Sequence, residues 1–178
     1  MPTDAAAVSA KTVNRAHLRD AGAPTGPTVW AARCPVGHAS QAFAATCRVC
    51  GQFIAPQEPQ EIPRPVLGRL VVPGGAPILL DSDLVLGRDP RVPQDASAAR
   101  PRLVVLNDPR MEVSSQHASI TLNFWDVCLT DLGSTNGTEI ITPDGRRQRL
   151  AQHTPVTITP QTRIVLAEVL ELLFEATG

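Results

Sequence analysis

A turn motif lies at Asp131-Leu132-Gly133-Ser134-Thr135-Asn136-Gly137-Thr138. Asn-Gly is the strongest short-range signal for a tight hairpin turn, and Gly137 directly after Asn136 is what such a turn requires. The Asn136 amide both donates and accepts hydrogen bonds, which suits it to grip an extended peptide backbone. An Asn-Gly pair alone is usually structural, so its meaning depends on the sequence around it.

Two shorter motifs precede this turn. Leu86-Gly87-Arg88 follows an apolar run, and Ser114-Ser115-Gln116-His117 comes later in the chain. Arg88 can direct two charge-assisted hydrogen bonds at phosphate oxygens, and Ser114 and Ser115 add hydroxyl and backbone donors from a turn. Each motif alone is a weak signal, because an arginine after an apolar run is usually a surface residue at a strand end. Together the three motifs offer the groups that a phosphate site needs.

Short apolar runs broken by turn signals fill the chain from residue 66 onward. They cover residues 66–72, 78–80, 84–86 and 103–106, and residues 120–130 alternate between apolar and polar side chains. This pattern of short apolar runs and turns predicts an all-β sandwich or barrel. Residues 159–175 are ambiguous, because Thr159-Pro160 resembles a helix start while the leucines that follow also fit a strand.

The three motifs, in this order on a β-rich chain, closely resemble the forkhead-associated (FHA) domain family. The resemblance covers about residues 66–175 and implies an eleven-strand β-sandwich whose loops at one end bind phosphothreonine peptides. It also implies that residues 159–175 form the last two strands. The expected fold is thus all-β, an FHA-type sandwich preceded by a small zinc ribbon.

Carried over residue by residue, the resemblance assigns the phosphopeptide to Arg88, Ser114, Ser115, Thr135 and Asn136. Arg88 and Ser114 resemble the family's phosphate ligands, and Thr135 and Asn136 its peptide-contacting pair. Ser115 is a departure, because many members have arginine, lysine or asparagine there, and it leaves the strength of phosphate binding in question.

Three further residues resemble supporting positions of the family. Gly87 and Gly137 resemble its turn-permitting glycines, and His117 resembles the histidine that braces the binding loops. The segment between Arg88 and Ser114 is long, and its arginines could add positive charge.

A separate cysteine block has the pattern Cys34-x3-His38-x8-Cys47-x2-Cys50. Three thiolates and an imidazole make a closed tetrahedral set of ligands, which is typical of structural zinc. A segment this short cannot bury a core alone, so a bound metal would hold it together. A redox pair at Cys47 and Cys50 is the alternative, but the βαβ context that it needs is missing. Cys128 lies apart and is expected to be an inert thiol of the sandwich.

These observations divide the chain into four parts: a flexible N-terminal tail at 1–29, a zinc ribbon at 30–55, a proline-rich linker at 56–65 and an FHA domain at 66–178. Hydrophobic residues make up 43% of the sequence, enough for a packed core. No run approaches the roughly 20 apolar residues of a membrane span, and the N-terminus lacks the features of a secretory signal. We therefore expect a cytoplasmic protein.

The expected function is that of a non-enzymatic adaptor that binds a phosphothreonine-containing protein downstream of a bacterial Ser/Thr kinase. A ribbon joined to an FHA domain also resembles actinobacterial adaptor proteins. One alternative is a phosphate-independent scaffold with a degenerate site. Another is a nucleic-acid-binding zinc ribbon, which the net charge of −1 disfavours. An enzyme is the least expected class, because no carboxylate or oxyanion hole accompanies Ser114 and His117.

Overall fold

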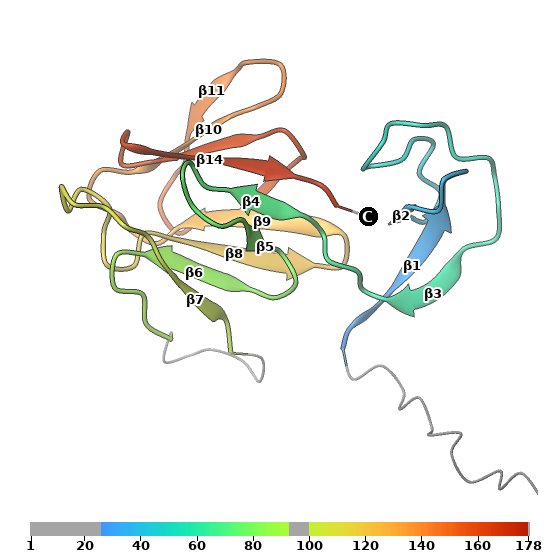
Figure 1. Cartoon of the computed structure of the whole chain (residues 1–178), viewed down its shortest axis with the longest axis horizontal. Helices are drawn as coiled ribbons and strands as arrows, with labels where there is room; N and C mark the ends of the chain where they lie inside the picture. The colour runs from blue at the N-terminus through green and yellow to red at the C-terminus, as the bar shows by residue number, and fades with distance from the viewer. Residues whose placement is uncertain (1–25, 93–99, 178) are drawn as a thin grey trace, which may run out of the picture.

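The computed structural model describes residues 26–92 and 100–177, which form fourteen β-strands and no helix (Figure 1). Most of the predicted tail at 1–29, namely residues 1–25, lies outside the described residues. In the described ranges nothing helical is long or apolar enough to cross a membrane.

Two sheets with eleven strands in total make up the chain from residue 69 to residue 175, which confirms the predicted all-β sandwich. The first sheet has the order β11-β10-β13-β14-β4-β5 and the second the order β12-β9-β8-β6-β7. Neighbouring strands are antiparallel except β6 and β7, which are parallel. The strands are β4 (Arg69–Val71), β5 (Ile78–Leu79), β6 (Leu84–Gly87), β7 (Arg102–Val105), β8 (Ala118–Asn123), β9 (Asp126–Asp131), β10 (Thr138–Ile141), β11 (Arg147–Arg149), β12 (Val156–Ile158), β13 (Arg163–Leu166) and β14 (Leu170–Glu175).

The core between the two sheets consists of aliphatic side chains and one phenylalanine. Alternate residues of the strands point inward, as the pleat of a strand requires. The largest of the buried hydrophobic side chains are Phe174, Leu67, Leu70, Leu80, Leu84, Leu86, Ile120, Leu129, Ile164, Leu166 and Leu172. This core fixes both sheets and, with them, the loops at the ends of the strands.

The ambiguous C-terminal segment forms strands β13 and β14, as the resemblance implied. Leu172 and Phe174 are buried in the core, whereas Glu171 before them is exposed and Leu173 between them is half-buried. The two strands pair antiparallel with each other, and β14 also pairs with β4. Packing of every second side chain against the opposite sheet therefore overrides the helix start that Thr159-Pro160 resembles.

The N-terminal unit is a three-stranded sheet of order β2-β1-β3, formed by β1 (Thr28–Arg33), β2 (Ala39–Gln41) and β3 (Gln60–Pro63). We call residues 28–63 the ribbon. It differs from the expected layout in two respects: residues 28–29 of the predicted tail belong to β1, and residues 60–63 of the predicted linker at 56–65 pair with β1. Pro63 at the end of this edge strand is compatible with pairing, because a proline there removes no essential ladder bond.

Arg48 joins the ribbon to the sandwich. Its guanidinium donates to Leu67 O at 2.6 Å, Val66 O at 3.2 Å and Thr177 O at 2.8 Å. It also lies over the Trp125 ring, 5.3 Å from the centroid. Two further contacts cross the same boundary: Arg64 donates to Leu122 O at 2.8 Å, and the Trp125 indole donates to Trp30 O at 2.9 Å. The ribbon thus sits at the end of the sandwich where β8 ends and β9 begins (Figure 1).

Replacing Arg48 with lysine should loosen the ribbon without unfolding the sandwich. An ammonium cannot direct several hydrogen bonds at once or stack flat on an indole, so carbonyls of the 66–67 segment and Thr177 lose their donor. We expect a loss of about 1–3 kcal/mol in docking and faster amide exchange in residues 28–63, measured by hydrogen–deuterium exchange. Arg33→Lys is the control, because the Arg33 guanidinium contacts only Gly37 O within its own ribbon. Equal exchange in the two variants would contradict this role of Arg48.

Candidate functional site

The end of β6 lies directly against the Ser114–Ser115 turn. The Arg88 N–H donates to Ser114 O at 3.1 Å and the Asp89 N–H to Ser115 O at 3.2 Å. A Cβ on Gly87 would lie 2.0 Å from Ser115 O, so only glycine permits this approach. The first two motifs are thereby brought together, although 25 residues separate Arg88 from Ser114.

The Arg88 side chain is partly buried and lacks a carboxylate partner among the described residues. Its Nη2 lies 3.4 Å from Ser115 Oγ, and its Nε is buried without a hydrogen-bond partner in the described chain. A buried donor of a charged group costs free energy when it is left unpaired. The positive charge beside the Ser115 hydroxyl suits an anion, which would neutralise it and accept from the guanidinium.

The third motif contributes exposed groups on the other side of Ser114. The Thr135 N–H donates to Ser114 Oγ at 3.0 Å, and Asn136 Nδ2 donates to Glu112 O at 3.0 Å. Ser114 Oγ accepts in this contact, so its own proton stays available for a ligand. The structure therefore brings together all five predicted phosphopeptide residues: Arg88, Ser114, Ser115, Thr135 and Asn136.

The buried carboxylate of Asp131 holds the third motif in place by accepting hydrogen bonds from it. Asp131 accepts from the Gly133 and Ser134 N–H groups at 2.9 and 2.8 Å, and from the Ser134 and Thr138 hydroxyls at 2.6 Å each. Burial raises the pKa of Asp131, but these hydrogen bonds outweigh it, and the pKa lies below its ordinary value. Asp131 belongs to the third motif but had no predicted role. Its position in the motif is a signal for this role, because aspartate often accepts from N–H groups two and three residues ahead in a turn.

His117 is fully buried and connects two of the motifs. The Ser114 N–H donates to His117 Nδ1 at 3.1 Å, so Nε2 carries the proton and donates to Gly137 O at 3.1 Å. Burial lowers the pKa of His117, only partly opposed by the Gly137 carbonyl and Asp131, and this favours the neutral ring. His117 contacts the Ser114 backbone and not its hydroxyl, so the two are not arranged as base and nucleophile.

Arg149 supports the Asn136–Gly137 turn, and nothing in the sequence pointed to it. Its Nη2 donates to Asn136 O at 2.8 Å, and a Cβ on Gly137 would lie 2.2 Å from the same nitrogen. Gly137 also has a φ of 85°, which favours glycine. Of the arginines in the long segment after Arg88, Arg102 lies opposite Leu84 at the far end of β6 and contacts Asp81. It therefore adds no charge at the Arg88 end of the strand.

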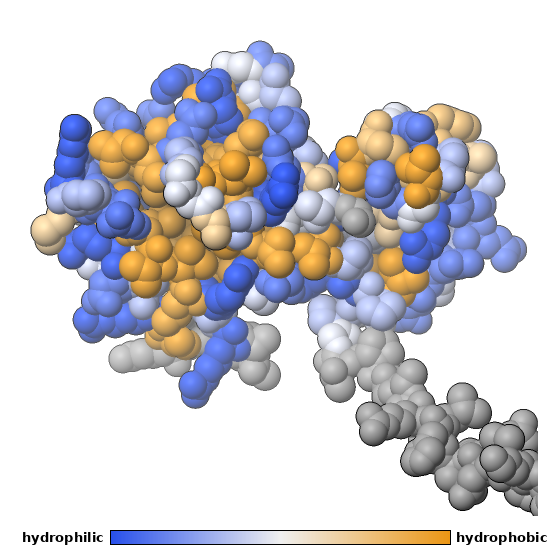
Figure 2. Space-filling model, viewed as in Figure 1, coloured by the Kyte–Doolittle hydropathy of each residue, from blue (hydrophilic) through white to orange (hydrophobic). Residues whose placement is uncertain are grey.

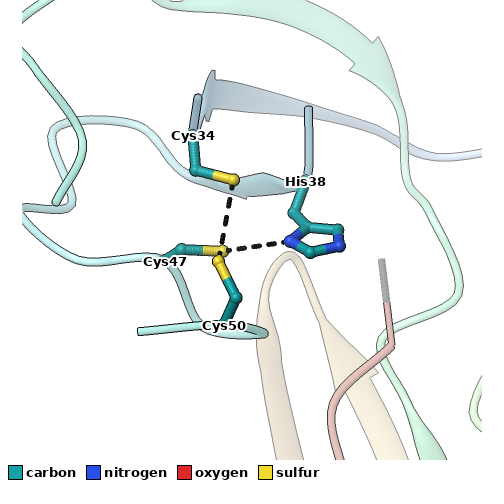
Figure 3. Close-up of side chains that lie close together, drawn as sticks. All are labelled: Cys34, His38, Cys47 and Cys50. Carbon is teal, nitrogen blue, oxygen red and sulfur yellow. Dashed lines mark hydrogen bonds between the residues drawn. The ribbon is translucent and has the colours of Figure 1, made fainter. Parts of the chain in front are cut away.

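A second cluster lies in the ribbon and consists of Cys34, His38, Cys47 and Cys50 (Figure 3). Their four ligand atoms lie within 4.8 Å of one another. Cys34 Sγ is 3.9 Å from Cys50 Sγ, and Cys47 Sγ is 3.8 Å from His38 Nδ1. A tetrahedral ion with metal–sulfur bonds of about 2.3 Å needs ligand separations of about 3.8 Å. The predicted residues therefore fit a metal ion.

The backbone around Cys47 favours its thiolate form. Burial raises the pKa of Cys47, but hydrogen bonds from backbone N–H groups at Cys50 and Val49 prevail and lower it to about 6. The Val49 N–H lies 3.4 Å from the sulfur. Gly51 has a φ of 71°, which permits the turn after Cys50. Cys128 is in β9, remote from this cluster, 3.7 Å from Thr157 Oγ1.

Comparison with known proteins places the sandwich in a family. Residues 84–167 match the sequence model of the FHA domain. Among solved structures, the chain is similar to the FHA domain of CT664 from Chlamydia trachomatis, with 27% identity over 63% of this chain and 97% of that one and a TM-score of 0.44. The comparison with curated proteins finds no match.

Two other similar structures contain phosphopeptides. One is EmbR from Mycobacterium tuberculosis in complex with a low-affinity phosphopeptide, with 20% identity over 74% of this chain and 27% of that one and a TM-score of 0.47. The other is the N-terminal FHA domain of S. cerevisiae Rad53p with a phosphothreonine peptide, with 17% identity over 63% of this chain and 94% of that one and a TM-score of 0.44.

Asp131→Asn should destabilise the protein in a pH-dependent way. The folded pKa of Asp131 is depressed, so its contribution to stability is present above the unfolded pKa of about 3.9 and is lost as pH falls through the folded value. We expect the variant to lose about 1–3 kcal/mol near neutral pH and the difference to shrink below about pH 4. Urea denaturation across this range measures it. Asp126→Asn, at the exposed start of the same strand, is the control; a pH-independent loss for Asp131→Asn would contradict the role assigned to its charge.

Proposed function

The chain contains an FHA domain, and we propose that this domain binds phosphothreonine segments of a partner protein, which makes the chain a phosphorylation-dependent adaptor. The observation that carries the proposal is the partly buried Arg88, which lies beside Ser115 Oγ and has no carboxylate partner among the described residues. A phosphate has about −1.5 to −2 charges at neutral pH and three acceptor oxygens. It would satisfy both the charge and the donors of Arg88.

The groups around Arg88 support recognition of a phosphorylated peptide and not of a free anion. The Ser115 hydroxyl lies 3.4 Å from Arg88 Nη2, and the Ser114 hydroxyl, which accepts from the Thr135 N–H, keeps its own proton to donate to the phosphate. Asn136 uses one N–H on Glu112 O, and its remaining amide groups are exposed to accept from and donate to a peptide backbone. Thr135 is exposed beside it. The loops thus combine an anion site with a backbone grip.

Because a phosphothreonine must be made by a kinase, the adaptor would act downstream of a Ser/Thr kinase. The partner would bind only after phosphorylation, so the kinase would set the timing of assembly. The chain itself needs no catalytic group for this role.

Arg88→Ala should abolish most of the affinity for a phosphothreonine peptide. Loss of the bidentate charged contact should cost about 2–5 kcal/mol of binding free energy. Arg88→Lys should recover only part of this binding free energy, because an ammonium cannot donate two parallel hydrogen bonds in a fixed geometry. Calorimetric titration with a degenerate phosphothreonine peptide library and its unphosphorylated twin measures both effects. Binding should weaken as pH falls through the second phosphate pKa of about 6 and as salt is added.

Arg91→Ala is the matched control, because Arg91 is an exposed arginine three residues away that pairs with Asp89. It should bind the phosphopeptides as the wild type does. The proposal is wrong if the phosphorylated and unphosphorylated peptides bind equally, or if Arg88→Ala keeps full affinity. That result would favour a phosphate-independent scaffold, with Ser115 marking a degenerate site.

We further propose that the ion held by Cys34, His38, Cys47 and Cys50 is zinc. Three thiolates and one imidazole suit zinc, and four protein ligands leave no open position, so the site would be structural. When bound, zinc would cross-link the β1–β2 turn to the Cys47–Cys50 turn. Since Arg48 stands between two of the ligands in sequence, the metal would also hold in place the side chain that docks the ribbon.

Zinc content and folding of the ribbon should depend on the same cysteines. Cys50→Ser should lose zinc from the purified, reduced protein and expose residues 28–63 to amide exchange, because the ribbon has little core of its own. Cys128→Ser, the matched control in β9, should keep one zinc per chain. Elemental analysis by mass spectrometry measures the metal. Absence of zinc from freshly prepared wild-type protein, or full zinc in Cys50→Ser, would contradict the assignment.

A further inference from the structure

Five of the six aromatic side chains of this protein line two hollows that share Phe43, one between the ribbon and the sandwich and one within the ribbon. They are Trp30, Phe43, Phe53, Phe124 and Trp125. The larger hollow has a volume of ≈ 590 Å³ and the smaller one ≈ 350 Å³, and Phe43 lines both. We call the two hollows together the junction groove. Figure 2 shows hydrophobic side chains at the surface of the ribbon and of the sandwich alike.

Two of these aromatic residues are exposed in turns that disfavour them. Phe43 is 86% exposed with a φ of 63°, and Phe124 is 67% exposed with a φ of 51°. Positive φ favours glycine or asparagine, and a bulky side chain there costs stability. Phe124 and Trp125 fill the two-residue turn between β8 and β9, where Asn-Gly is usual. Folding does not explain two exposed phenylalanines at such positions, but a binding role does.

The chemistry of the junction groove selects an uncharged, apolar ligand. None of the described residues that line it is aspartate, glutamate, lysine or arginine. The Trp30 ring is 58% exposed, and its indole N–H has no partner in residues 26–92 and 100–177. An exposed indole donor among aromatic rings is suited to a peptide carbonyl that arrives with apolar side chains. Nucleic acid is disfavoured, because nothing in the lining meets a phosphate.

The chain's own prolines indicate which apolar ligand fits. Pro56 lines the smaller hollow and Pro59 the larger one, so prolines three residues apart already line the same hollows as the aromatic rings. The Gln57 side chain holds this segment in place through hydrogen bonds with both Arg33 N and Arg33 O, at 3.1 and 2.9 Å. A polyproline II helix repeats every three residues, and proline-rich ligands dock in aromatic-lined grooves at little entropic cost.

We propose that the junction groove binds a proline-rich segment of a partner protein, in a polyproline II conformation, with a backbone carbonyl accepting from the Trp30 indole. The groove lies at the opposite end of β8 and β9 from His117 and Asp131, about 20 Å away at the rise of a six-residue strand. The phosphothreonine site and the junction groove can therefore be occupied at the same time. A partner with both features would bind more tightly than either site alone allows.

The protein has its own reporter for this binding. Its only two tryptophans, Trp30 and Trp125, both line the junction groove. A polyproline peptide of about ten residues, titrated into the full chain, should change the tryptophan fluorescence and reach saturation. A glycine–serine peptide of equal length should not. A saturating amount of phosphothreonine peptide should leave the polyproline affinity unchanged, which separates the two sites.

Two variants remove the aromatic rings and suit the backbone better. Phe124→Asn and Phe43→Asn each place an asparagine at positive φ, so the melting temperature should be unchanged or higher. Polyproline affinity should fall about tenfold or more in each. Met111→Asn is the matched control: Met111 is 64% exposed with a φ of 58° and does not line the groove. It should bind polyproline as the wild type does.

Several outcomes would overturn the proposal. One is a fluorescence response to polyproline that is no greater than the response to the glycine–serine peptide. Another is wild-type polyproline affinity in both phenylalanine variants. A dimer in analytical ultracentrifugation that Phe124→Asn dissociates would make the groove a self-association surface instead. Binding of polyproline only after deletion of residues 1–25 would mean that the chain's own N-terminal segment is the resident ligand.

Discussion

Four hydrogen bonds onto the buried carboxylate of Asp131 are the constraint on which the binding loops depend. They close the 131–138 turn on itself and fix the place of Ser134, whose hydroxyl in turn accepts from the Gly137 N–H. His117 joins this turn to the Ser114 backbone, and Gly87 lets β6 approach the same place. These hydrogen bonds and the close approach at Gly87 thus connect three loops from different parts of the chain next to Arg88. A site prepared in this way loses little entropy when it binds.

The ribbon is attached by a different kind of contact. Its own buried cluster is small, with Ala32, Cys34, Cys47 and Ile54, so it cannot depend on apolar burial alone. Arg48 compensates by donating hydrogen bonds to the carbonyls of residues 66, 67 and 177, and it lies in sequence between Cys47 and Cys50, two members of the cysteine and histidine cluster. The consequence is that the ribbon and the sandwich together form a surface that neither has alone.

The two proposed binding surfaces have opposite chemistry. The loop end of the sandwich has exposed polar groups and Arg88, which lacks a carboxylate partner among residues 26–92 and 100–177, whereas the junction groove is uncharged and aromatic. Because they lie at opposite ends of the same strands, neither blocks the other. This separation is what an adaptor requires if phosphorylation controls only one of two contacts with its partners.

Much of the architecture followed from sequence patterns that depend on local chemistry. Short apolar runs broken by turns predicted the all-β sandwich, and the resemblance of the ordered motifs to FHA domains implied which residues meet around Arg88. The cysteine and histidine spacing predicted a four-ligand cluster, because a ligand set of this kind needs particular residue types close together in the chain. Arg149, the pairing of residues 60–63 with β1, and the junction groove were decided by the tertiary structure. Each depends on segments far apart in sequence whose contact is set by the packing of whole sheets, and no local pattern encodes which surfaces that packing brings together.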